Sequence, residues 1–194
     1  MATAGPYAAG TVVTAISGTV DWTDPDNVKA DDNSYAYVSF NQGVSETGAE
    51  SSYLIKATNF NSGSFIPVGA TVDGITVAVH RKSNRDIGAT TYVRDSNVQL
   101  LKTSGVPGGS DDKAATGTNW PTTEATASYG GAADTWTAGL TYADVNSANF
   151  GMQLKCNGAW TVSNTPIGSI DYITITIEYT EVAVAGSRRN VGIL

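Results

Sequence analysis

The sequence contains few of the residues on which many folds and sites depend. Cys156 is the single cysteine, so an intrachain disulfide is excluded and the fold must rest on packing. Leucine is scarce and Lys plus Arg number 11 in 194 residues, which disfavours long amphipathic helices. No apolar run approaches the ~18 residues of a membrane span. The first residues lack the basic and apolar segments of a signal peptide, so we expect synthesis and folding in a cytoplasm.

Positive charge is also scarce. The formal net charge is −7, which argues against nucleic acid as a partner, because counterion release needs a cluster of cations. The pairs Arg81-Lys82 and Arg188-Arg189 are the nearest approach to one, and they are typical of solvated surface. His80 is the single histidine, which excludes sites that require two.

What is present is a period of two. In the segment 170–180, Ile173, Ile175, Ile177 and Tyr179 fall on one face, while the intervening Thr and Glu side chains fall on the other. This alternation predicts an extended strand with one buried and one wetted face, as in antiparallel sheets packed face to face. Shorter patterns of the same kind occur at 11–16, 35–40, 52–60, 75–82, 92–102, 125–129 and 150–156. His80 falls on the polar side of its segment, where we expect it to lie at the surface or pack on the sheet.

These patterns predict an all-β fold, a jelly-roll-like antiparallel β-sandwich of about eight strands. We expect the sandwich to span 21–180, with an N-terminal arm or edge strand over 1–20 and a C-terminal arm over 181–194. Both arms hold few large apolar side chains, so we expect them to be poorly ordered in the isolated protein. Within 140–146, Thr141 and Asp144 predict a capped helix of one or two turns. Asn157-Gly158 predicts a tight hairpin turn.

Carboxylates crowd two loops and raise the question of chemistry. Asp24 and Asp26 lie in a loop with Asp31 and Asp32, and Asp111-Asp112 lies in another. Loop aspartates more often make local turns than form the acid pair of a glycosidase. Oxygen ligands on a loop also suit calcium, and Asp24 and Asp26 are the candidates, although their spacing matches no EF-hand. We expect no cofactor and no catalytic residue.

Four tryptophans and nine tyrosines raise sugar binding as an alternative. Trp22 and Trp120 stand beside turn prolines or Asp-rich loops at strand ends, where aromatic rings plug the rim of a sandwich. The same two rings are the candidates for stacking on a glycan. Filling of the core by these aromatic rings is the favoured interpretation.

The order of short motifs along the chain resembles a family of virion structural proteins of tailed bacteriophages and prophages. The match runs from Trp22 to Tyr179. The first motifs are Trp22-Thr-Asp-Pro-Asp-Asn27, Asp31-Asp-Asn-Ser-Tyr35, Leu54-x-x-Ala-Thr-Asn-Phe60 and Ile66-Pro-x-Gly-Ala-Thr-x-x-Gly-Ile75. They are followed by Asp95-x-x-Val-Gln-Leu-x-Lys102, Trp120-Pro121, Tyr129-Gly-Gly131 with Trp136, Leu140-Thr-x-Ala-Asp-Val-Asn146 with Phe150-Gly151, and Ile170-Asp-Tyr-Ile-x-Ile-x-Ile-x-Tyr179. The chain departs from the usual pattern at Asp24, where Asn is commoner.

The resemblance implies a jelly-roll or related sandwich that acts by binding, without catalytic residues. We therefore expect a non-enzymatic capsid decoration protein on the outside of the head, found in the virion. Its partners would be the major capsid protein and further copies of itself, without nucleic acid or membrane. Arg188, Arg189 and Leu194 of the C-terminal arm are the candidate interface residues. The alternative is a carbohydrate-binding or adhesion module of a tail fibre or baseplate, and a glycoside hydrolase is a third class.

Overall fold

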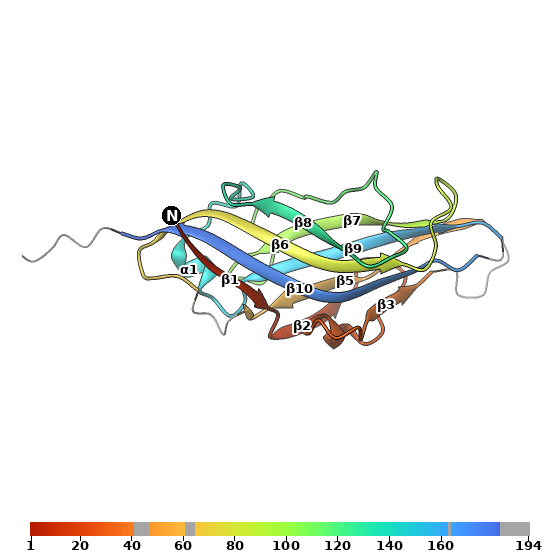
Figure 1. The fold of residues 1–194 in the computed structure, drawn as a ribbon, viewed down its shortest axis with the longest axis horizontal. Helices are drawn as coiled ribbons and strands as arrows, with labels where there is room; N and C mark the ends of the chain where they lie inside the picture. The colour runs from red at the N-terminus through yellow and green to blue at the C-terminus, as the bar shows by residue number, and fades with distance from the viewer. Residues whose placement is uncertain (41–46, 61–64, 163, 183–194) are drawn as a thin grey trace, which may run out of the picture.

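Two antiparallel β-sheets packed face to face form the fold in this computed structural model, which describes residues 1–40, 47–60, 65–162 and 164–182 (Figure 1). Sheet A contains β1 (Ala2–Ala8), β3 (Ala36–Ser39), β6 (Thr71–Ser83), β8 (Ala125–Gly131) and β10 (Ile167–Thr180). Sheet B contains β2 (Thr11–Ala15), β4 (Gly48–Ser51), β5 (Leu54–Thr58), β7 (Tyr92–Leu101) and β9 (Gly151–Trp160).

The strand order identifies the sandwich as jelly-roll-like. Sheet A runs β1-β10-β6-β8 with β3 also on β10, and sheet B runs β2-β5-β9-β4 with β7 also on β9. From β5 to β10, each successive strand lies in the opposite sheet, so every connection crosses the sandwich. The expected all-β sandwich is confirmed, with ten described strands in place of about eight. The sequence pattern had not indicated β1 and β4.

Strand β10 has the inward face that its alternation predicts. Ile173, Ile175 and Ile177 are fully buried between the sheets. Thr174 on the opposite, mostly wetted face is buried, so a wetted position is wrong for this residue. The strand is central: β6 pairs with one of its edges, while β1 and β3 share the other.

The N-terminal residues form edge strands of both sheets. β1 pairs with β10 from Ala2↔Tyr179 to Ala8↔Thr174, and β2 pairs with β5. The edge-strand expectation for 1–20 therefore agrees with the structure, whereas the expectation of a poorly ordered arm does not. Main-chain pairing with the long β10 holds this segment despite its small side chains. Figure 1 shows the N-terminus beside the end of β10. Residues 183–194, with Arg188, Arg189 and Leu194, lie outside the described residues.

The hairpin expected at Asn157-Gly158 is wrong, because β9 runs straight through this dipeptide. Asn157 pairs with Ser51 of β4 and Gly158 pairs with Val93 of β7. The glycine serves packing here: the Phe40 ring occupies the space that a Cβ at position 158 would need. A close approach of a side chain, and no turn, explains this glycine.

The remaining short elements agree with the sequence. The helix α1 (Tyr142–Val145) starts at Thr141, whose hydroxyl accepts from the Asp144 amide at 3.2 Å while the Asp144 carboxylate accepts from the Thr141 amide at 2.9 Å. A 3₁₀ turn, η1 (Pro25–Val28), precedes β3.

Cys156 is buried, and burial raises the pKa of its thiol to about 12. Among the described residues, no helix is long and apolar enough to span a membrane.

The two faces of β10 can be tested by truncation. Ile175→Ala is expected to lower the free energy of unfolding by about 2–5 kcal/mol, because it leaves a cavity between the sheets. Thr176→Ala, on the half-buried outer face next to it, should cost less than about 1 kcal/mol. Denaturant unfolding of both variants measures the difference. Equal, small losses would show that Ile175 does not lie in the core.

Candidate functional site

The two tryptophans considered for glycan stacking lie in the core. Trp120 is fully buried, and its indole donates to Asp95 Oδ1 at 2.8 Å. Trp22 is also buried and donates to the Tyr53 carbonyl at 2.9 Å. Neither ring presents a face to a ligand, because both belong to the buried core of the sandwich. Trp120→Ala would remove part of the core and is therefore unsuitable as a test of sugar binding.

The loop considered for calcium does not gather its carboxylates around a common point. Asp26 pairs with Lys29 at 2.6 Å. Asp24 is exposed and adopts a left-handed backbone conformation before η1, without a side-chain cap. Its role is that of a turn residue, as expected for loop aspartates. A different set of groups with metal-ligand character does converge: Asp31, His80 and Glu124.

A buried ion pair joins the two sheets. Arg81 of β6 in sheet A donates to Asp95 of β7 in sheet B, and both are almost inaccessible to solvent. Asp95 also accepts from the Tyr129 hydroxyl at 2.9 Å and the Ala115 amide at 3.0 Å, in addition to Trp120. The Arg81 guanidinium lies 4.8 Å from the centre of the Trp120 ring. We call these four side chains, Arg81, Asp95, Trp120 and Tyr129, the sheet-joining cluster.

The sheet-joining cluster is suited to structure and not to chemistry. Each Asp95 oxygen accepts hydrogen bonds, and burial excludes a substrate. Burial, with Asp95 nearby, raises the pKa of Tyr129 far above its ordinary value, so its hydroxyl remains a donor. The aromatic rings complete the enclosure of the guanidinium.

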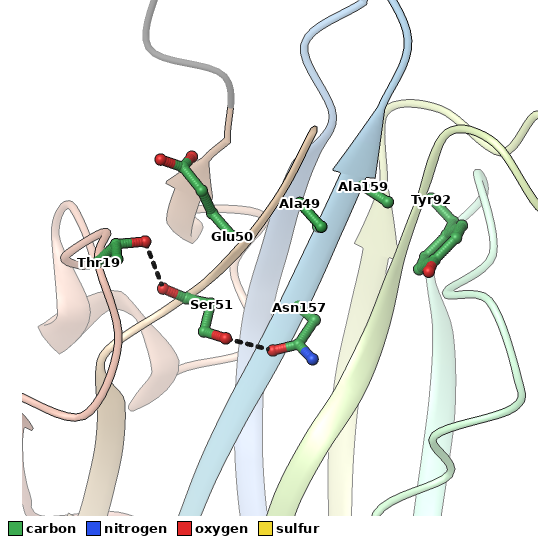
Figure 2. A pocket seen from close by; sticks show the side chains of 8 residues that line it. Thr19, Ala49, Glu50, Ser51, Tyr92, Asn157 and Ala159 are labelled. Atoms are coloured by element: carbon green, nitrogen blue, oxygen red, sulfur yellow. Dashed lines mark hydrogen bonds between the residues drawn. The ribbon is translucent and has the colours of Figure 1, made fainter. Parts of the chain in front are cut away.

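A shallow groove lies on the outer face of sheet B. It measures about 250 Å³ and lies over β4, β9 and the start of β7 (Figure 2). Its floor is made of small residues, and a tyrosine stands on one side with polar groups on the other. The lining residues are Thr19, Ala49, Glu50, Ser51, Tyr92, Asn157, Gly158 and Ala159.

The polar groups of the groove are held in place. Ser51 donates to Asn157 Oδ1 at 2.8 Å, which leaves the amide nitrogen of Asn157 on the groove side of this pair, as Figure 2 shows. The Arg94 guanidinium lies 3.8 Å from the centre of the Tyr92 ring and fixes it from one side. Arg94 is itself anchored to Asn119 at 2.5 Å. A half-buried aromatic ring beside an amide over a flat floor can bind a small polar ligand such as a sugar ring.

Sequence reasoning missed this groove and the sheet-joining cluster. Tyr92 and Asn157 lie 65 positions apart, and only the pairing of β7 with β9 brings them to one face. Asp95 stands between the polar residues Arg94 and Ser96, so the local sequence gives no sign that its side chain faces inward. The register shift between Asp95 and Asn97 contributes to that orientation.

Comparisons with known proteins do not assign this chain to a family. No protein-family model matches the chain, and no curated protein matches it. Among solved structures, one similar chain is the N-terminal endo-1,4-β-D-xylanase 10B of Clostridium thermocellum, its CBM22-1 and GH10 modules complexed with xylohexaose. The identity is 15%, the TM-score is 0.35, and the match covers 94% of this chain and 29% of that chain. This chain thus spans less than a third of that protein, and a likeness at this level carries no inference about function.

The structural role of the sheet-joining cluster predicts graded losses of stability. Asp95→Ala should lower the free energy of unfolding by about 3–5 kcal/mol, because it leaves the Arg81 charge buried without a partner. Tyr129→Phe removes two hydrogen bonds, the one that the hydroxyl accepts from Arg81 and the one that it donates to Asp95, and should cost about 1–3 kcal/mol. Denaturant unfolding of both variants provides the comparison. A loss for Asp95→Ala as small as that for Tyr129→Phe would mean that water reaches Arg81.

Proposed function

We propose that this chain is a non-enzymatic structural protein of a tailed-bacteriophage virion, attached to the outside of the head as a decoration protein. The observation that supports the proposal is the order of shared motifs from Trp22 to Tyr179. Residues of these motifs make hydrogen bonds that hold the sandwich together. Asp95, Trp120 and Tyr129 belong to the sheet-joining cluster. Asn146 binds the backbone of Phe65 and Ile66. Residues shared for their structural role fit a protein that works by shape and contact.

A decoration protein needs surfaces that meet neighbours. β2 is an edge strand of sheet B. Val13 on this strand and Ile16 directly after it expose 52% and 82% of their surface. Apolar side chains at a sheet edge suit burial against another subunit, by main-chain pairing or packing. The C-terminal residues Arg188 and Arg189 supply positive charge on an otherwise acidic chain, which favours contact with an acidic partner.

Attachment to heads tests the proposal directly. The protein is expected to co-sediment with empty heads assembled from the major capsid protein encoded in the same genome. Deleting residues 183–194 should leave the melting temperature unchanged and increase the dissociation rate from heads about tenfold or more, because part of the contact is lost. Charge reversal at Arg188 and Arg189 should act in the same direction, whereas Arg85→Glu on an exposed loop serves as the matched control.

One result would contradict the decoration role, and another would contradict only the place of attachment. Absence of any co-sedimentation of the intact chain would remove the decoration role. Full retention of the truncated chain on heads would remove the C-terminal residues from the interface and leave the edge beside Val13 and Ile16 to be tested by Val13→Glu with Ile16→Glu.

Carbohydrate binding is the second candidate, and the groove of Figure 2 favours it. Its aromatic side chain, fixed amide and floor of small residues provide what a sugar ring needs for stacking and hydrogen bonding. This function would place the chain in a tail fibre or baseplate. It differs from decoration in its ligand, and the two can be tested separately.

A glycan array with the purified chain tests the groove. If the groove binds a sugar, Tyr92→Ala should weaken that binding about tenfold or more, because stacking is lost. Tyr37→Ala is the matched control, since Tyr37 is an exposed tyrosine on β3 of the other sheet. Unchanged binding in Tyr92→Ala, or an array without any saturable signal, would exclude the groove as a sugar site.

A further inference from the structure

A cluster of acidic side chains with one histidine lies on the outer face of sheet A. Asp31, His80 and Glu124 each present a ligand atom, and these three atoms lie within 4.8 Å of one another. Two ligands of one cation are at most about 4–5 Å apart, because each lies 2.0–2.6 Å from the ion. The three groups therefore have the spacing of a shared coordination sphere. They come from the loop after η1, from β6 and from the residue before β8.

A fourth carboxylate lies beneath them. Asp171 is fully buried, and neither of its side-chain oxygens accepts a hydrogen bond in the structure. Burial raises the pKa of Asp171, and the Glu124 and Asp31 carboxyls add to the effect, which places all three together. The backbone amides of Asn33 and Asp32 act in the opposite direction without completing a hydrogen bond. One oxygen of Glu124 is also buried without a partner.

A β-bulge directs Asp171 to this face. The register of β10 on β6 passes from Ile170↔Arg81 to Tyr172↔His80, so Asp171 is the extra residue. A bulge places an additional side chain on one face of a sheet, and such bulges recur beside functional sites. The backbone of Lys29 forms an isolated β-bridge with Tyr172, the residue after Asp171. This bridge brings the loop that carries Asp31 close to Asp171. A hydrophobic or neutral residue at the bulge would have avoided a buried charge.

Among the described residues, no Lys or Arg side chain forms an ion pair with the cluster. The ion pair within it joins His80 Nδ1 to Asp31 at 3.8 Å. Lys29 pairs with Asp26, the Lys82 ammonium lies over the Tyr35 ring at 3.7 Å, and Arg81 points inward to Asp95. Three carboxylates therefore face one imidazole. A buried carboxylate without a hydrogen bond or a counter-charge is costly in its ionised form, so it either takes up a proton or is accompanied by an ion.

We propose that Asp31, His80, Glu124 and Asp171 bind a divalent cation of the Zn²⁺ or Mn²⁺ type. Carboxylates alone would suit Ca²⁺ or Mg²⁺, and the imidazole nitrogen shifts the preference toward a first-row transition ion. The ion fastens the loop after η1 to β6, β8 and β10. This site is separate from the Asp24 and Asp26 pair and does not depend on the proposed function.

Metal-dependent melting of the full, untagged chain tests the site after dialysis against EDTA. Zn²⁺ or Mn²⁺ at about 100 times its dissociation constant should raise the melting temperature by roughly 5–10 °C, with one ion bound per chain by calorimetry. Asp171→Asn should melt no lower than the wild type in EDTA, because it removes a buried charge, and should lose the metal-dependent rise. His80→Gln should weaken binding at least tenfold.

The matched control is Asp26→Asn, which removes an acidic group that already pairs with Lys29 and should keep the full metal response. The proposal is overturned if neither Zn²⁺ nor Mn²⁺ raises the melting temperature of the wild type. It is also overturned if Asp171→Asn responds to metal as the wild type does. A response to Ca²⁺ alone that survives His80→Gln would remove the imidazole from the site and contradict the assigned class of ion.

Discussion

The ion pair between Arg81 and Asp95 is the interaction on which the rest of the sandwich depends. It is a charged contact between sheet A and sheet B deep in an otherwise apolar interior. Apolar side chains tolerate small shifts of one sheet over the other, whereas a hydrogen-bonded charge pair does not. Because Trp120 and the Ala115 amide also bind Asp95, the pair fixes the path of the segment before β8 as well as the two sheets.

Other motif residues also use polar side chains to fix the connections between strands. Asn146 accepts from the amides of Phe65 and Ile66 and donates to the Ile66 carbonyl, so it replaces a missing strand partner for the connector into β6. The Trp136 indole donates to the Ile75 carbonyl at 3.0 Å. In each case one side chain satisfies buried backbone groups where the sheet ends. Motif residues of this kind connect the ends of strands to neighbouring loops, and they carry no information about a ligand.

Much of the fold follows from local patterns, and the rest depends on contacts that local patterns cannot contain. The alternation around Ile175 predicts β10 and its buried face, and Thr141 with Asp144 predicts the capped helix. Asn157-Gly158 misleads, because a glycine needed for a turn and one needed to admit the Phe40 ring look the same in sequence. The sites are less predictable still. Tyr92 and Asn157 share one face only because β7 pairs with β9, and Asp31 approaches His80 only because a loop folds over sheet A.

The two proposed binding sites lie on the outer faces of the sheets. These two faces differ. On sheet B the outer face is hollowed over β4 and β9, and its tyrosine and amide are fixed but open to a ligand. On sheet A a loop covers part of the outer face, where a bulge in β10 places a carboxylate that no donor among the described residues satisfies. A contact surface tolerates exposed polar groups, whereas the ionised form of a buried, unsatisfied carboxylate is costly without a compensating charge. For this reason the bulge in β10, and not the hollow on sheet B, is the part of the described surface where a bound cation would change stability most.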